Sequence, residues 1–208
     1  MTKIETGTEV MLGRREGRVA VLTFNRPEAR NALHPDTYSA LEHLLPTLAE
    51  DADVGAVMLT GAGGAFCAGG DVKGMNARNS GKAPLPTSLE SAVDNLRARQ
   101  RSVSAALHNF PKVTVAAIDG AAAGAGLSIA LACDLRVGSP RAIFTTAFAK
   151  VGFSGDFGGS WFLTQLVGAA KARELYLTAD RFNAEQALSL QVVNEILDDA
   201  DFESAAVA

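Results

Sequence analysis

Two turns rich in glycine and alanine are the part of this sequence that could do chemistry without a reactive side chain. The first, residues 61–72 (GAGGAFCAGGDV), follows an apolar, β-branched stretch, and the second, residues 120–126, follows another. Small residues leave backbone N–H groups accessible to a ligand. A helix that begins at Gly126 would turn its positive end towards the second turn. The two turns therefore predict an oxyanion hole, in which two backbone amides stabilise one developing negative charge.

Three better-known arrangements of reactive residues fit this sequence poorly. Residues 124–129 (GAGLSI) begin like a dinucleotide-binding fingerprint, but Ile129 replaces the third glycine and no acidic residue follows about 20 positions later. Neither turn contains the Gly-Lys-Ser/Thr of a P-loop. Residues 126–130 (GLSIA) resemble a serine nucleophile elbow, yet every histidine precedes Ser128, which is the wrong order for that fold. A serine hydrolase on an unrelated topology is the alternative that stays open.

Composition predicts a single α/β domain without a membrane or nucleic-acid partner. The chain has 208 residues, enough for one sizeable core, and its net charge of -4 argues against general nucleic-acid binding. Residues 1–10 lack the apolar segment of a signal peptide, and the best apolar stretch, residues 121–132, is too short to span a membrane. Cys67 and Cys133 are expected to be buried thiols, with a disulfide between them as the alternative. We therefore expect a cytoplasmic protein.

Strands that alternate with helices are predicted to position the two turns. Apolar, β-branched stretches predict strands at residues 18–25, 54–60, 113–118, 135–137 and 143–144. Helical spacing predicts helices at residues 35–50, 89–109, 126–133, 158–167, 169–177 and 184–190. Pro46 weakens the pattern of the first helix, whereas Asn183 and Gln186 form a capping box for the last. Residues 75–87 are polar and predict a loop. This alternation predicts βαβ-type units and a largely parallel sheet.

Three segments resemble the enoyl-CoA hydratase/isomerase (crotonase) superfamily. They are residues 22–33 (LTFNRPEARNAL), residues 64–72 (GAFCAGGDV) and residues 118–134, which contain IDG, GAG and LACD. The similarity continues from residues 150–153 (KVGF) to Asn194, so it covers nearly the whole chain. The resemblance implies an α/β fold of the ClpP/crotonase type, a spiral of ββα units. It also implies CoA bound along one face and assembly into trimers or dimers of trimers.

The resemblance also implies roles for individual residues. Gly70 and Ala125 correspond to the two oxyanion donors. The residues expected to contact substrate or CoA are Ala29, Arg30, Ala68, Gly69, Asp71, Val72, Lys73, Gly124, Ser128, Phe148 and Phe153. Arg30 or Lys73 would meet a phosphate of the nucleotide, the alternative being a solvated surface charge. Because the CoA thioester is itself the substrate, no separate cofactor and no metal is implied.

Two positions depart from the hydratase pattern and draw attention to a third. Ser128 and Phe148 stand where hydratases carry glutamates, whereas Asp156 stands where some isomerases and a related dehalogenase branch carry an acid. A single carboxylate suits a proton shuttle between two carbons better than hydration, which usually needs two groups. Burial near Phe148, Phe153 and Trp161 would raise the basicity of Asp156, unless this residue is instead the N-cap of the next helix. Ser128 is expected to be a packing residue rather than a nucleophile.

The end of the chain is a second departure. Members of the superfamily usually continue with C-terminal helices that cover the acyl pocket and build the trimer, whereas here residues 193–197 are followed by an acidic stretch and Ala-Val-Ala. We therefore expect these helices to be short or absent, in a shortened or truncated member. The leading hypothesis is an enoyl-CoA isomerase with Asp156 as its acid/base. The alternatives are a hydratase that adds water to 2-enoyl-CoA and a catalytically silent acyl-CoA-binding subunit.

Overall fold

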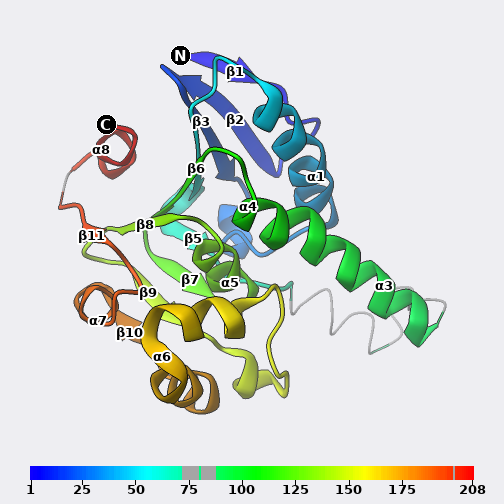
Figure 1. The fold of residues 1–208 in the computed structure, drawn as a ribbon, viewed down its shortest axis with the longest axis vertical. Coiled ribbons are helices and arrows are strands. Elements are labelled where there is room, and N and C mark those ends of the chain that lie inside the picture. The colour runs from blue at the N-terminus through cyan, green and yellow to red at the C-terminus, as the bar shows by residue number, and fades with distance from the viewer. Residues whose placement is uncertain (72–79, 81–87, 199) are drawn as a thin grey trace.

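The computed structural model describes residues 1–71, 80, 88–198 and 200–208, and it contains a large and a small sheet with helices around them (Figure 1). The large sheet has the order β1-β2-β3-β4-β6-β8-β11. Its parallel strands are β3 (Val19–Phe24), β4 (Ala56–Gly61), β6 (Val113–Ile118), β8 (Leu135–Gly138) and β11 (Glu195–Ile196). The antiparallel strands β1 (Thr2–Ile4) and β2 (Met11–Glu16) extend one edge. The largely parallel sheet is confirmed, but β1 and β2 are missing from the prediction because most of their residues are polar or charged.

The small sheet is made of short strands, and three of them directly follow a strand of the large sheet along the chain. Its order is β10-β9-β7-β5, with β5 (Ala65–Cys67), β7 (Ala121–Ala123), β9 (Ile143–Thr145) and β10 (Phe182–Asn183). Strand β5 follows β4, β7 follows β6 and β9 follows β8, and a helix comes after each pair. This repeat is the predicted spiral of ββα units. The interpretation of residues 65–67 and 121–123 as parts of turns is wrong, because these alanine-rich segments are three-residue strands.

The helices lie close to the predicted ones, except for α8 (Phe202–Val207), which was not predicted. They are α1 (Pro35–Glu50), α3 (Leu89–Gln100), α4 (Ala106–His108), α5 (Ala125–Leu131), α6 (Gly159–Thr178), α7 (Ala184–Ser189) and α8 (Phe202–Val207). The π-helical turn η3 (Arg101–Ala105) joins α3 to α4, and the short turns η1 (Pro27–Ala29), η2 (Ala62–Gly64) and η4 (Phe148–Val151) lie in the connections. Helix α1 continues through Pro46, which is exposed. Helix α6 changes direction at Gly168, where two helices were predicted. The capping box of Asn183 and Gln186 is confirmed.

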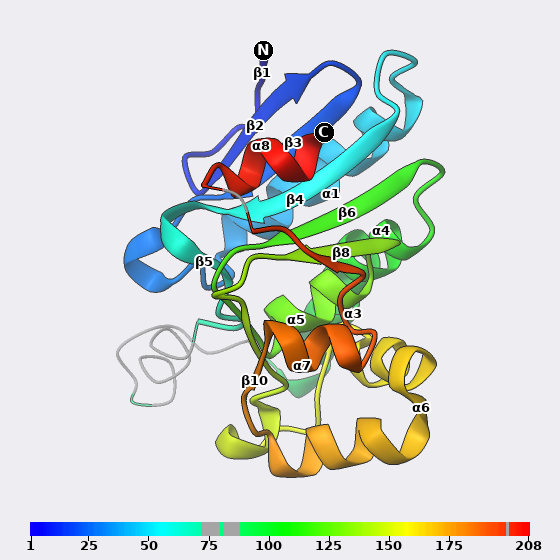
Figure 2. The same ribbon diagram turned by 90° about the vertical axis from the view of Figure 1, so that its left-hand side faces the viewer.

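The large sheet is covered on both faces (Figure 2). Because side chains alternate along a strand, Leu22 and Leu59 point into the main core with α1, whereas Val21 and Met58 point to the other face. There they pack with Phe202 of α8, which lies across the front of the sheet in Figure 2. The described part of the chain thus ends in a six-residue helix that closes a small second core.

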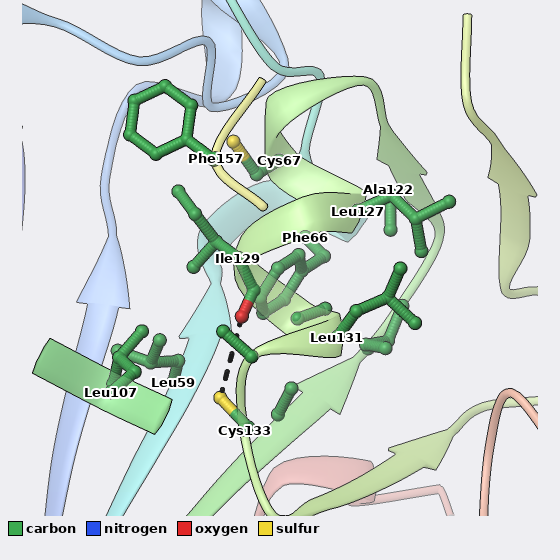
Figure 3. Packing of buried hydrophobic residues seen from close by; sticks show 14 of the residues in the cluster. Leu59, Phe66, Cys67, Leu107, Ala122, Leu127, Ile129, Leu131, Cys133 and Phe157 are labelled. Carbon is green, nitrogen blue, oxygen red and sulfur yellow. Dashed lines mark hydrogen bonds between the residues drawn. The ribbon is translucent and has the colours of Figure 1, made fainter. Parts of the chain in front are cut away.

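Both cysteines are free and buried in the core around α5 (Figure 3), as predicted. The Cys133 thiol donates a hydrogen bond to the Ile129 carbonyl oxygen at 3.7 Å, and burial raises the pKa of both thiols to about 12.

Within the described ranges, no helix combines the length and the apolar character needed to cross a membrane.

Candidate active site

A cavity of about 100 Å³ lies where the first turn, the start of α5 and the loop after β9 meet. It is lined by Ala68, Gly70, Gly124, Ala125, Ala147, Phe148, Val151, Phe153 and Asp156. Among these lining residues, Asp156 has the only charged side chain. The cavity is therefore apolar apart from backbone groups and one carboxyl group, which is a setting in which a few polar groups determine the chemistry.

The first turn is held in place by residues 30–33. The Ala68 N–H donates to the Arg30 carbonyl oxygen at 2.9 Å, and the Leu33 N–H donates to the Gly69 carbonyl oxygen at 2.8 Å. Gly69 has a φ of 86°, and a Cβ at this position would lie 2.6 Å from the Ala123 carbonyl oxygen and 3.1 Å from the Ala125 nitrogen. Only glycine can satisfy both conditions. The two turns are thus in direct backbone contact at Gly69.

The two residues expected to supply the oxyanion donors, Gly70 and Ala125, are brought together at the cavity. Both residues line it, and within the described part of the chain neither N–H donates a hydrogen bond to another protein group. Ala125 is the first residue of α5, so its N–H has no acceptor within the helix. Buried N–H groups are nearly always paired in native proteins. Two such donors at one apolar cavity can receive the oxygen of a ligand.

Asp156 lies on the loop between η4 and α6, flanked by Gly155 with a φ of 111° and Phe157 with a φ of 51°. Its Oδ1 atom is buried and has no hydrogen-bond partner in the part of the chain that the structure describes. Burial raises the pKa of the Asp156 carboxyl from its usual 3.8 to about 6, because the ionised form loses its hydration. The alternative of a helix cap is wrong, because Gly158 precedes α6 and no side chain caps that helix. The carboxyl group is available to exchange a proton near neutral pH.

The aromatic surroundings of Asp156 differ from the predicted ones at one residue. Phe148 and Phe153 line the cavity, as expected, but Trp161 does not and instead packs on His108 with 5.3 Å between ring centroids. Tyr176 is the aromatic residue found there instead. Its ring stacks on that of Phe148, with 6.1 Å between the ring centroids and 2° between the ring planes. Tyr176 was missed because it lies on the second half of α6, far along the chain, and has no neighbouring motif.

Besides Gly69, the structure describes four of the other residues that were predicted to contact substrate or CoA and do not line the cavity, Ala29, Arg30, Asp71 and Ser128. Ala29 and Arg30 adjoin the first turn, and the Arg30 side chain is exposed. Asp71 pairs with Arg26 at 3.5 Å, an ion pair that the sequence did not indicate. Ser128 is buried, 1% exposed, and lies behind the cavity wall rather than on it. Val72 and Lys73 are outside the described residues, as is most of the predicted loop at residues 75–87.

The described residues also include no cluster of three or more histidine, cysteine, aspartate or glutamate side chains arranged to hold a metal ion.

Ala147 and Val151, which were not predicted, complete the apolar wall beside Asp156. Ala147 has a φ of 60°, and its N–H donates a hydrogen bond to the Thr145 hydroxyl oxygen at 3.1 Å. Strained backbone of this kind gathers at functional sites.

The sequence and the fold are both similar to those of known enoyl-CoA hydratases and isomerases. The sequence pattern of the enoyl-CoA hydratase/isomerase family matches residues 14–208. The chain is 35% identical over 192 residues to the 1,2-epoxyphenylacetyl-CoA isomerase of Escherichia coli (strain K12), covering 92% of this chain and 71% of that protein. It is 34% identical over 193 residues to the short-chain-enoyl-CoA hydratase of Clostridium acetobutylicum, covering 92% and 70%. The crystal structure of an enoyl-CoA hydratase from Polaromonas sp. JS666 superposes with a TM-score of 0.85 at 34% identity, covering 95% of this chain and 74% of that one.

Proposed function

The chain belongs to the enoyl-CoA hydratase/isomerase family, and we propose that it is an isomerase that moves the double bond of an enoyl-CoA. One observation carries this proposal: the carboxyl group of Asp156, whose Oδ1 atom is buried, shares a small apolar cavity with two backbone amides, and none of these three groups has a hydrogen-bond partner among the described residues. Because the similar proteins include both an isomerase and a hydratase, the choice between the two reactions depends on these groups.

The amides of Gly70 and Ala125 would hold the thioester carbonyl oxygen. When a base removes a proton from the α carbon, the electron pair moves into the carbonyl and its oxygen becomes negatively charged. Two preorganised N–H donors stabilise that charge more than they stabilise the neutral carbonyl, which lowers the barrier. The surrounding apolar residues exclude water and strengthen these hydrogen bonds.

Asp156 would carry the proton. Its carboxylate takes a proton from the α carbon of a 3-enoyl-CoA, and the resulting carboxylic acid returns a proton to the γ carbon, which gives a 2-enoyl-CoA. No atom is gained or lost, and the carboxylate is regenerated. A pKa of about 6 suits both steps, because an acid/base near neutral pH can accept a proton and release it again.

Hydration is less well supported by the same residues. Water addition needs one group to activate the water and another to deliver a proton, a task usually shared by two side chains. Ser128 is buried and donates its hydroxyl proton to the Gly124 carbonyl oxygen, and Phe148 is apolar. Asp156 is the one titratable side chain among the residues that line the cavity.

The proposal also includes how the substrate is presented. The CoA thioester is bound as substrate with no separate cofactor, with its nucleotide near Ala29 and Arg30, which adjoin the first turn. A homo-oligomer, a trimer or a dimer of trimers, is the assembly that we expect. We also propose that this chain is catalytically active.

The test compares two substrates and their products. The protein is incubated separately with 3-hexenoyl-CoA and 2-hexenoyl-CoA, and products are identified by liquid chromatography and mass spectrometry. We expect the first to become the second with no change in mass. A 3-hydroxyacyl-CoA product, heavier by one water, that still forms with Asp156→Asn would contradict the proton shuttle. Tight binding without turnover or α-proton exchange in deuterated water would instead indicate a silent binding subunit.

A further inference from the structure

The peptide unit between Gly124 and Ala125 is held by its carbonyl oxygen. A trans peptide is planar, so its C=O and N–H groups point in opposite directions. The Gly124 carbonyl oxygen accepts a hydrogen bond from the Ser128 N–H at 3.0 Å and a second from the Ser128 hydroxyl at 3.2 Å. Any bond that orients this C=O therefore also aims the Ala125 N–H towards the cavity.

This peptide needs such an anchor because Gly124 itself restrains it little. Gly124 has a φ of 53° and a ψ of -126°, a conformation that is accessible essentially to glycine alone. Its N–H is bonded to the Thr145 carbonyl oxygen at 3.0 Å, which secures the preceding peptide but not the following one. Without a Cβ, rotation of the following peptide meets a small steric barrier, so Ser128 supplies the main restraint.

A second hydroxyl group, that of Tyr176, lies next to the Ser128 side chain. The two halves of α6 meet at Gly168, and the second half brings Tyr176 back over Gly159, the first residue of the helix. A Cβ at Gly159 would lie 2.1 Å from Ser128 Oγ and 2.6 Å from the Tyr176 hydroxyl oxygen, so both hydroxyls occupy the space that this glycine leaves open. Burial raises the pKa of Tyr176 to about 12, and the neighbouring Ser128 side chain opposes that rise.

The Tyr176 ring is itself restrained. It stacks on Phe148, and the neighbouring Leu175 carbonyl oxygen accepts a hydrogen bond from the Thr146 hydroxyl at 2.9 Å. The Tyr176 phenol stays protonated at neutral pH, and the Ser128 hydroxyl donates its proton to the Gly124 carbonyl oxygen, so in the proposed relay the phenol donates to Ser128. Donors arranged in a chain polarise and strengthen one another.

We propose that Ser128 and Tyr176 are positioning residues that aim the Ala125 amide at the substrate oxygen through this relay of hydroxyl groups. The proposal rests on the proposed oxyanion hole. Neither residue lines the cavity, so neither is expected to touch the substrate. Ser128 thus has a different function from a nucleophile or a mere packing residue.

The test measures enolate stabilisation directly. Acetoacetyl-CoA, a 3-ketoacyl thioester, ionises to an enolate that absorbs in the near ultraviolet, so its apparent pKa when bound reports how well the oxyanion is held. The titration is run above about pH 7, where Asp156 is ionised in every variant. The variants are Ser128→Ala and Tyr176→Phe. The second removes only the hydroxyl group and keeps the ring stacked on Phe148. Ser104→Ala is the matched control, because Ser104 is equally buried and donates to the Gln100 carbonyl at the same 3.2 Å, away from the cavity.

We expect the wild type to lower the apparent pKa of the probe relative to its value in solution. Ser128→Ala should raise the bound value by about one unit, a tenfold loss of enolate stabilisation, and Tyr176→Phe by about half a unit. In turnover, kcat should fall by similar factors while KM changes little, because the donor acts mainly on the transition state. Ser104→Ala should match the wild type.

An unchanged apparent pKa in folded Ser128→Ala, or an equal loss in Ser104→Ala, would overturn the positioning role and leave the proposed function standing. If Ser128→Ala does not fold by circular dichroism, Tyr176→Phe decides, and a value equal to the wild type overturns the relay. A wild type that binds the probe without lowering its pKa would overturn the oxyanion hole itself.

Discussion

The two sides of the cavity provide their working groups in different ways. On one side, two turns from the ends of β5 and β7 present backbone amides, those of Gly70 and Ala125. On the other side, the loop between η4 and α6 presents a side chain, that of Asp156. A backbone N–H survives every substitution except proline, so its position is protected only by the packing around it. A carboxyl group is removed by changing one residue.

Because of this difference, substitutions on the two sides of the cavity should have different effects. On the side of the turns, a substitution changes where a donor points and also disturbs the backbone contact between the turns. On the other side, a substitution of Asp156 removes the group that carries the proton and also removes a buried charge. The first kind should damage stability and enolate binding together, whereas the second should stop proton transfer while the protein becomes more stable.

The largest expected effect comes from removing the proton carrier. Asp156→Asn should lower kcat by about 10³-fold, because general acid–base catalysis contributes roughly 10²–10⁴-fold. The affinity for a CoA thioester should change only a few-fold, because both amides stay in place. Steady-state kinetics and isothermal titration with a substrate analogue measure the two quantities. An equal loss in binding and turnover would mean that the two sides are not separable.

A smaller but broader loss is expected on the side of the turns. Gly69→Ala places a Cβ 2.6 Å from the Ala123 carbonyl oxygen at a φ of 86°. We expect kcat/KM to fall about 10²-fold and the free energy of unfolding to fall by about 2–4 kcal/mol. Urea denaturation and kinetics check both.

Gly152→Ala is the control for Gly69→Ala, because Gly152 also has a positive φ, of 76°, but a Cβ there would meet nothing within 4 Å. It should cost only about 1 kcal/mol, the strain of a left-handed alanine, with kinetics unchanged. If the two variants lose stability equally, backbone strain rather than the contact between the turns is responsible.

The pH dependence should report Asp156 alone. The carboxylate is the base, so activity is lost on protonation, and kcat/KM should fall about tenfold per pH unit below a pKa of about 6 and level off above it. A profile over pH 4–9 in a constant ionic-strength buffer measures this limb. A limb that lies near pH 4 instead would show that the carboxyl group is hydrated rather than buried in the reacting enzyme.

The smallest expected effect is on stability. Because the folded-state pKa of Asp156 is raised from 3.8 to about 6, the native protein binds this proton more tightly than the unfolded chain. Its stability therefore falls as pH rises from about 4 to about 6 and stays lower above that. Asp156→Asn should be more stable at pH 8 by about 1–2 kcal/mol, after discounting for solvent around a half-buried group. Denaturation at pH 4 should show no such advantage, and an advantage of the same size at both values would exclude the buried charge as its cause.

Much of the fold follows from local patterns in the sequence. The strand β6 and the helix α1 have the predicted bounds, since apolar β-branched runs and helical spacing act over short stretches. The short strands β5 and β7 could not be predicted in this way, because three small residues become a strand only when neighbouring strands pair with them. The cap role weighed for Asp156 and the role of Trp161 beside it were wrong for a similar reason, as both depend on how the loop after η4 returns to the cavity.

The sequence by itself determined that two glycine-rich turns follow buried strands and that the expected glutamates are replaced by Ser128 and Phe148, leaving Asp156 as the candidate acid. The first conclusion follows from residue types and local spacing, whereas the second rests on the resemblance to the hydratase pattern. Only the tertiary structure decided that, among the described residues, the amides of Gly70 and Ala125 and the buried Asp156 Oδ1 have no hydrogen-bond partner, and that Tyr176 lies beside Ser128 at Gly159. Hydrogen-bond partners and desolvation depend on residues that are distant along the chain, and no local pattern encodes them.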